Sequence, residues 1–358
     1  MIIINTVPTE RNGLTTSVFN YIKNLDMQVD YVSINEPTDS VFRQIITERG
    51  GSFYVVPQRL KHPVKYFFAL MKILPGQEAM HVHGNSATMA IELLAGFLSG
   101  VRMRIAHSHS TRCEYRKADT LLRPLFYLLC THRLACGQDA GQWLFPNREF
   151  TVFNNAIDIE SFRFSRGLRD EKRRLLGIDP EETVFLQLAN FDPVKNHEFT
   201  VDAYAIYKKQ NPDKPSRLVF CGGGQRMKSI KARAQQRGLA EGRDIVFAGS
   251  VMDTPAWYSA ADIFLLPSKY EGMPMTLIEA QSAGLICIVS DNVSRAINYS
   301  DRIRFAQLDV DRWAREMAVT FDYDRDRISD EGIVSLRAAG YDIKTEAVRL
   351  KRLYTGKE

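Results

Sequence analysis

The chain has 358 residues, of which 45% are hydrophobic and 25% are charged, and its formal net charge at pH 7 is +5. This composition excludes disordered, collagen-like and disulfide-scaffold proteins, and the length favours two domains that each have their own core. No apolar run approaches the roughly 20 residues of a membrane-spanning helix. The first residues, MIIINTVPTE, lack the basic region of a secretory signal, so we expect a cytoplasmic protein.

Short apolar segments alternate with amphipathic helical segments along the first half of the chain. We expect strands at Ile2–Thr6, Gln28–Ile34, Ser52–Val56, Ala79–His83 and Met103–His107. We expect helices at Thr15–Leu25, Ser40–Arg49 and Ser86–Leu98. Strands that alternate with helices predict right-handed βαβ units and a parallel sheet.

The second half repeats this alternation after Asp158–Asp179, a stretch rich in Arg, Asp and Glu that we interpret as a linker. Strands are expected at Thr183–Ala189, Arg217–Cys221, Asp244–Ala248, Ile263–Pro267 and Ile286–Ser290. Helices are expected at Glu198–Lys209, Met227–Gly238, Pro255–Ser259, Met275–Ala283 and Asp342–Leu353. We predict an α/β protein with two doubly wound, Rossmann-like parallel-sheet domains facing across a cleft. The domains are residues 1–165 and 166–340, and the C-terminal helix at about 341–358 can pack back on the first.

Ligands of open α/β sheets bind beyond the carboxyl ends of the strands, so we consider the loops there. The loop after the first expected strand has the single glycine Gly13 in place of G-x-G-x-x-G, and no Walker lysine follows Gly222–Gly224. These absences argue against a nicotinamide dehydrogenase and a P-loop ATPase. A tight turn explains the three consecutive glycines as well as a phosphate site does.

The most informative loop is PSKYEGMPMTLIEAQSAG at positions 267–284. A turn with Glu271 leads into a helix whose first backbone N–H groups can hold a phosphate. Glu279 lies about one turn into that helix. Two carboxylates eight positions apart, on either side of an anion site, suit hydroxyl groups at the two ends of a diphosphate. A Glu near the start of a helix often only complements the helix dipole, and this would explain Glu279 taken alone. It would not explain the whole sequence from 267 to 284.

This E-x7-E string, with Gly-Met-Pro inside it and E-A-x-x-A-G after it, resembles the donor site of family 4 of the retaining glycosyltransferases, which have the GT-B fold. The resemblance covers nearly the whole chain and is greatest to bacterial capsule and exopolysaccharide glycosyltransferases. It also includes IAHSHST at 105–111, VFNNAID at 152–158, NFDPVKNH at 190–197 and the dipeptide AD at 261–262.

The resemblance implies catalytic roles for His109, Lys195 and Glu271. His109 would face the reacting sugar, Lys195 would pair with the diphosphate and Glu271 would hold the donor-sugar hydroxyls. Glu279 would bind the ribose hydroxyls. We expect His107 to face away from His109. The full set implied for donor binding is Gly13, Asn190, Lys195, Val251, Glu271, Gly272, Met273, Met275, Thr276 and Glu279.

Each of the remaining donor residues has a more limited implied role. Gly13 would let its loop approach the donor phosphates, and Val251 would lie against the nucleobase. Met275 and Thr276 would offer helix N-terminal amides to the diphosphate. Asn190 stands where the family usually has Arg, so one of two positive charges on the diphosphate is missing.

The charge on the departing diphosphate can be stabilised by Lys195 and the helix terminus without a metal. We find no His/Asp cluster with ligand spacing, and the five cysteines form no C-x-x-C pair. The sequence therefore predicts no metal ligands, no cofactor, no structural zinc and no disulfide framework.

The predicted function is a retaining, metal-independent glycosyltransferase that moves a hexose from a nucleotide-sugar, a UDP-sugar, to a growing, lipid-linked saccharide. Two alternatives remain open. One is a non-catalytic GT-B subunit that supports a partner glycosyltransferase, which Asn190 motivates. The other is a GT-B UDP-sugar epimerase.

Positive charge is concentrated between Gln58 and Arg133, where eleven Lys and Arg oppose four Asp and Glu. Nucleic acid is not an expected partner, because no nucleic-acid-binding motif accompanies this excess. Gln58–Leu74 places basic residues among aromatic and aliphatic ones, so such a helix could rest on the anionic inner face of the cell membrane, near a lipid-linked acceptor. The alternative is a half-buried helix with a solvated basic face.

Overall fold

The computed structural model describes residues 1–10, 12–37, 39–319 and 324–356, which form two compact units. Unit 1 comprises Met1–Ile157 and Asp342–Glu358, and unit 2 comprises Asp158–Tyr341. The division therefore lies before the predicted boundary at 165/166, and the last helix belongs to unit 1. Every helix within the described ranges is too short or too polar to span a bilayer.

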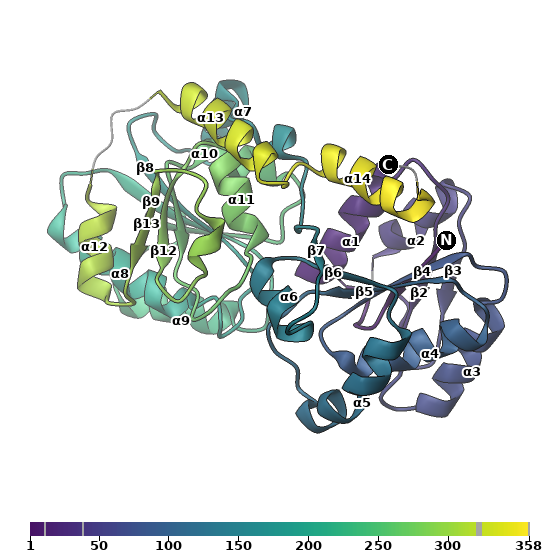
Figure 1. The fold of residues 1–358 in the computed structure, drawn as a ribbon. Coiled ribbons are helices and arrows are strands. Elements are labelled where there is room, and N and C mark those ends of the chain that lie inside the picture. Colours follow the sequence, from purple (N-terminus) through teal and green to yellow (C-terminus); the bar gives the residue numbers. More distant parts are fainter. Residues whose placement is uncertain (11, 38, 320–323, 357–358) are drawn as a thin grey trace. The chain divides into compact units, whose positions relative to one another are not determined.

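Unit 1 contains a seven-stranded parallel sheet in the order β3-β2-β1-β4-β5-β6-β7 (Figure 1). The strands are β1 Ile2–Asn5, β2 Asp30–Ser33, β3 Phe53–Val55, β4 Ala79–Gly84, β5 Met103–Ser108, β6 His132–Ala135 and β7 Thr151–Val152. The helices are α1 Gly13–Asn24, α2 Ser40–Glu48, α3 Pro63–Ile73, α4 Ala90–Leu98, α5 Arg116–Leu129, α6 Gln138–Leu144 and α14 Ile343–Thr355, with the 3-10 turn η1 Ala87–Met89.

Helices cover both faces of this sheet, so its strands bury apolar side chains on both faces. Met80 and Val82 of β4 pack in a core with α3, α4 and α5. Ile3 of β1 packs in a second core on the other face, with α1, α2 and α14. Leu350 of α14 lies in that second core, so the end of the chain completes the face that the first helices begin.

Unit 2 contains a six-stranded parallel sheet in the order β10-β9-β8-β11-β12-β13. The strands are β8 Thr183–Leu188, β9 Ser216–Cys221, β10 Ile245–Gly249, β11 Ile263–Leu266, β12 Ile286–Ser290 and β13 Ile303–Ala306. The helices are α7 Arg166–Leu175, α8 His197–Gln210, α9 Met227–Gln236, α10 Thr254–Ala260, α11 Met275–Ser282, α12 Val310–Met317 and α13 Arg325–Ala338, with the 3-10 turns η2 Ile159–Phe162 and η3 Arg295–Ile297.

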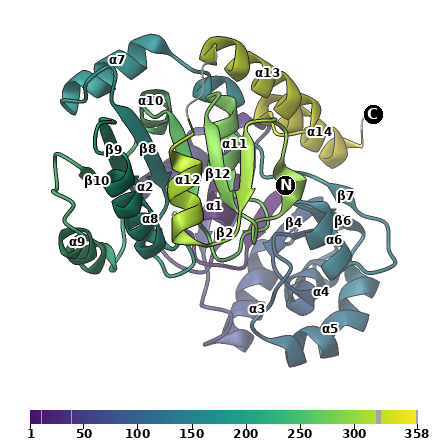
Figure 2. The same cartoon turned by 90° about the vertical axis from the view of Figure 1, so that its left-hand side faces the viewer.

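The sheet of unit 2 is also covered on both faces, as the turned view shows (Figure 2). Phe220 and Ile288 pack in a core with Tyr204 of α8 and Trp313 of α12. The helices α7, α10, α11 and α13 lie on the opposite face. The prediction of two doubly wound parallel sheets is therefore confirmed.

The interpretation of Asp158–Asp179 as a linker is wrong, because the segment contains α7, which packs against α10. Arg173 of α7 is buried, and its guanidinium donates to the Ala260 carbonyl at 3.1 Å and to Asp262 at 3.2 Å. The charged residues that suggest a solvated linker therefore include Arg173, which binds the end of α10. The sequence analysis also missed three strands, namely β6, β7 and β13. All five cysteines are free thiols.

Candidate active site

The loops that follow β8, β9 and β10 are joined to one another at the carboxyl edge of the unit 2 sheet. The Ala189 amide donates a hydrogen bond to the Cys221 carbonyl at 2.9 Å, and the Phe191 amide donates to the Gly223 carbonyl at 2.8 Å. The Gly222 amide donates to the Gly249 carbonyl at 2.7 Å. The strand order changes direction between β8 and β11, where open α/β sheets bind their ligands. The loops after these two strands are therefore the first place to look for a site.

Gly222 and Gly224 allow the loop after β9 to approach the loop after β8. A Cβ on Gly222 would lie 2.0 Å from the Ala189 carbonyl oxygen, and its φ of +147° is one that L side chains rarely adopt. A Cβ on Gly224 would lie 3.0 Å from the Phe191 nitrogen, and its φ is +137°. Close backbone packing thus accounts for these glycines.

Lys195, in the loop after β8, forms an ion pair with Glu271, in the loop after β11. Lys195 Nζ lies 2.7 Å from Glu271 Oε2, and the two side chains are 25% and 13% exposed. The Ser268 hydroxyl donates to the other carboxylate oxygen of Glu271. The structure thus brings together the cation predicted for the diphosphate and the carboxylate predicted for the sugar.

The backbone holds these two loops side by side. The Lys269 amide donates to the Val194 carbonyl at 2.8 Å, and the Asn196 side chain donates to the Pro267 carbonyl at 3.2 Å. Asn196 has a φ of +57°, a left-handed conformation that Asn tolerates better than most residues. On the other side, the Ser294 amide donates to the Glu271 carbonyl at 3.1 Å. The position of Glu271 is therefore fixed from both neighbouring strands.

The helix α11 begins directly after this turn. Pro274 is its N-cap residue, no side chain of the described residues caps its first amides, and its first turn contains no acidic residue. Met275 and Thr276, the first residues of the helix, are half-buried, as is Met273, while Gly272 is exposed. The amides predicted to meet a diphosphate thus start within four residues of Glu271.

Glu279 is half-buried on α11, and Tyr258 of α10 contacts it. The Tyr258 hydroxyl donates to Glu279 Oε2 at 2.6 Å. Burial raises the pKa of the Glu279 carboxyl to about 7, although the Tyr258 hydrogen bond acts in the opposite direction. Sequence reasoning missed Tyr258, because it lies in a different βα unit and no motif spacing links it to Glu279.

Asn190 and Val251 occupy neighbouring loops on the same edge of the sheet. Asn190 follows β8 and is exposed, while Val251 follows β10 and is half-buried. The hydrogen bonds that join the loops after β8, β9 and β10 place both residues along the β10 side of the edge. This arrangement suits a nucleobase at Val251 with the phosphates toward β8.

The two remaining predicted residues, Gly13 and His109, belong to unit 1. Gly13 is exposed at the start of α1, where the Asn12 side chain accepts the Thr15 amide at 2.9 Å. His109 follows β5, and its Nε2 lies 2.8 Å from His83 Nδ1. Burial lowers the pKa of His109 to about 4, so its ring is neutral at pH 7.

The expectation that His107 faces away from His109 is wrong. The two rings stack with their centroids 4.2 Å apart. The reason is that side chains two residues apart on a strand point to the same face of the sheet.

The chain is similar to proteins of one functional class. Residues 169–299 match the model of the family described as glycosyl transferases group 1. EpsF of Bacillus subtilis, named as a glycosyltransferase, is 29% identical over 80% of this chain and 78% of that one. A UDP-Gal:alpha-D-GlcNAc-diphosphoundecaprenol alpha-1,3-galactosyltransferase of Escherichia coli is 27% identical over 81% and 79%. The crystal structure of Anabaena HepE with UDP-glucose superposes with a TM-score of 0.79 at 15% identity over 99% of both chains.

Proposed function

We propose that this glycosyltransferase, whose residues 169–299 match the glycosyl transferases group 1 model, moves a hexose from a UDP-sugar to a growing, lipid-linked saccharide, with retention. The observation that carries this proposal is the pair of Lys195 and Glu271 beside the start of α11. A relative named for a UDP-galactose donor and a diphosphoundecaprenol acceptor, and a structural neighbour that holds UDP-glucose, support the choice of substrates.

The site divides the donor between two carboxylates. A diphosphate that departs from the sugar gains negative charge, and a preorganised cation and uncapped helix amides stabilise that charge. Lys195 and the first turn of α11 supply these groups, so we propose that transfer needs no metal at the diphosphate. Glu271 would accept the sugar hydroxyls and Glu279 the ribose hydroxyls.

The test is to incubate the protein with UDP-sugars and measure UDP release with and without an undecaprenyl-diphosphate-linked saccharide. We expect UDP release that depends on the acceptor. An epimerase would interconvert the sugars with little UDP, and a non-catalytic subunit would do neither, so either result would contradict the proposal. The same assay in EDTA should keep its rate, whereas loss that Mg²⁺ restores would contradict metal-free stabilisation of the diphosphate.

We also propose that α3 docks unit 1 on an anionic membrane surface. Its inner side, Tyr66 and Leu70, is buried in the core. Its outer side carries Val64 and Phe68, four residues apart, which are 66% and 60% exposed, and Leu60, in the turn before the helix, is 65% exposed. A helix with only a solvated basic face would be polar there.

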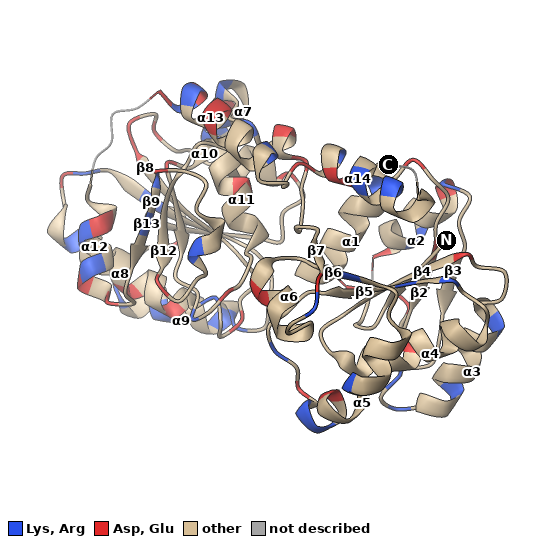
Figure 3. Ribbon diagram, in the orientation of Figure 1, with Lys and Arg blue, Asp and Glu red and all other residues tan. Residues whose placement is uncertain are grey.

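Basic and apolar side chains share this surface. Exposed lysines at 61, 65 and 72 lie on and beside α3, and Lys and Arg also mark α5, which packs on the other side of α4 (Figure 3). Leu121 and Leu128 of α5 are 80% and 79% exposed. Apolar side chains that enter the headgroup region among lysines are the signature of an interfacial helix. A lipid-linked acceptor would be presented from the same surface.

Replacing Lys61, Lys65 and Lys72 with Glu should release the protein from acidic liposomes, because each positive charge contributes about 1 kcal/mol near such a surface and reversal costs more. The measurement is sedimentation with phosphatidylglycerol vesicles. The matched control reverses three exposed lysines of unit 2, at 209, 214 and 228, and should keep binding. If the amount of protein that sediments with the vesicles is unchanged by the α3 substitutions, or by added salt, the alternative of a solvated basic helix face is supported.

A further inference from the structure

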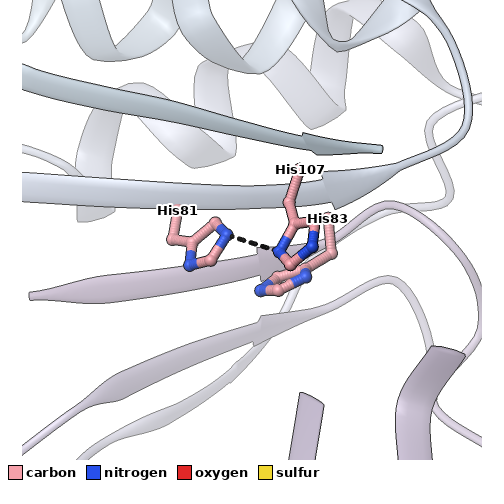
Figure 4. A group of neighbouring side chains, drawn as sticks. All are labelled: His81, His83 and His107. Atoms are coloured by element: carbon pink, nitrogen blue, oxygen red, sulfur yellow. Dashed lines mark hydrogen bonds between the residues drawn. The ribbon is translucent and has the colours of Figure 1, made fainter. Parts of the chain in front are cut away.

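Three histidines converge on one face of the unit 1 sheet. His81 and His83 lie on β4 and His107 lies on β5, and the parallel register pairs His83 with His107. All three are buried, and one nitrogen from each ring lies within 4.8 Å of the others (Figure 4). The sequence predicts no such cluster, because the histidines at 81, 83 and 107 meet only through the pairing of β4 with β5.

Outer hydrogen bonds hold two of these rings in place. His81 Nδ1 lies 2.5 Å from the Tyr354 hydroxyl of α14, and His81 Nε2 lies 3.1 Å from His107 Nδ1. His83 Nδ1 lies 2.8 Å from His109 Nε2. Metal-binding histidines commonly have their second ring nitrogen fixed by such a partner. Tyr354 and His109 are in position to do this for His81 and His83.

The protein does not complete the hydrogen bonding of the cluster by itself. His107 Nε2 and His109 Nδ1 are buried and form no hydrogen bond of standard geometry within the described residues, although the Phe153 backbone and the Asn155 side chain lie close enough to act on the two rings. Buried polar atoms of this kind are rare and often mark the place of an ion or a water.

We propose that His81, His83 and His107 bind one divalent transition-metal ion, for which zinc is the best match. Imidazole nitrogens suit zinc and its neighbours, whereas Mg²⁺ and Ca²⁺ require oxygen ligands. The ion would join β4 to β5 and, through Tyr354, to α14. It would also fix the orientation of His109 through His83, which makes it a positioning site in unit 1 and not a counter-ion for the diphosphate.

The test uses the full chain, purified without a polyhistidine tag and equilibrated with zinc in a metal-free buffer. We expect about one zinc ion per chain and a higher unfolding temperature with zinc than with EDTA, because an ion that binds only the folded state stabilises it. Cobalt added to the metal-free wild type should give a visible absorption band that zinc removes. Wild-type protein that takes up neither ion would overturn the proposal, whatever happens to the variants.

Variants locate the ion. His83→Gln and His107→Gln should each abolish stoichiometric binding, while Tyr354→Phe should weaken it by roughly 10-fold, as loss of an outer partner does. His62→Gln, an exposed histidine at the start of α3, is the matched control and should bind zinc normally. A folded double variant of His83 and His107, judged by circular dichroism, that still binds one zinc would overturn the assignment. These measurements need neither donor nor acceptor, so their failure leaves the proposed transfer reaction intact.

Discussion

Lys195→Ala should reduce the turnover number by roughly 10²-fold or more, the range for removing one group that stabilises transition-state charge. The Lys195 ammonium already lies at the switch point of the sheet, 2.7 Å from Glu271. Asn190, on the same loop, cannot supply the second cation that the family usually has. We therefore expect Lys195 to carry most of the positive charge on the diphosphate, and UDP release at saturating donor measures its loss.

Lys269→Ala is the matched control for this variant. Lys269 is exposed in the adjoining loop, and its contact with Val194 uses its backbone amide, which the substitution keeps. Its rate should stay within a few-fold of the parent. A Lys195→Ala rate equally close to the parent would mean that other groups hold the diphosphate. We expect Asn190→Arg to raise UDP affinity. If other groups hold the diphosphate, Asn190→Arg should leave UDP affinity unchanged.

Glu279→Gln should weaken UDP binding by about 1–3 kcal/mol, because ribose hydroxyls lose a charged acceptor. Burial raises the pKa of Glu279 to about 7, so the carboxyl is mostly protonated at pH 6 and mostly ionised at pH 8. If the ionised form binds the ribose, UDP affinity rises between these pH values and binding at pH 6 releases a proton. Calorimetry in buffers with different ionisation enthalpies measures both effects, and Glu279→Gln should lose them.

The same pKa predicts how stability changes with pH. The folded chain holds the Glu279 proton to a higher pH than the unfolded chain, whose pKa is near the ordinary value of 4.5. The stability that this group contributes is therefore complete below that value and is lost as pH rises through about 7. Glu279→Gln should then raise the free energy of unfolding relative to the parent more at pH 8 than at pH 5.

Two further variants are the controls for Glu279. Glu271→Gln should spare UDP binding and impair transfer, because Glu271 is assigned to the sugar end. Tyr258→Phe should move the pH dependence of UDP binding upward, since the Tyr258 hydroxyl lowers the pKa of Glu279. Equal loss of UDP affinity in Glu271→Gln and Glu279→Gln would contradict the assignment of the two ends.

The sequence by itself determined the features that depend on neighbouring residues. Strict alternation of apolar strands and amphipathic helices requires parallel sheets, so both doubly wound units could be predicted. Glu271 and Glu279 were found because one strand-loop-helix unit holds both. The missed strands β7 and β13 are short or half-buried, so their apolar patterns are weak.

Only the tertiary structure decided which distant residues meet. Strand order places the loop of Lys195 beside that of Glu271, and strand register stacks His81, His83 and His107. Helix packing brings Tyr258 to Glu279, and the return of α14 to unit 1 brings Tyr354 to His81. The physical reason is that a local pattern specifies which face of an element is buried, whereas the partner of that face depends on how all the elements pack around the shared core.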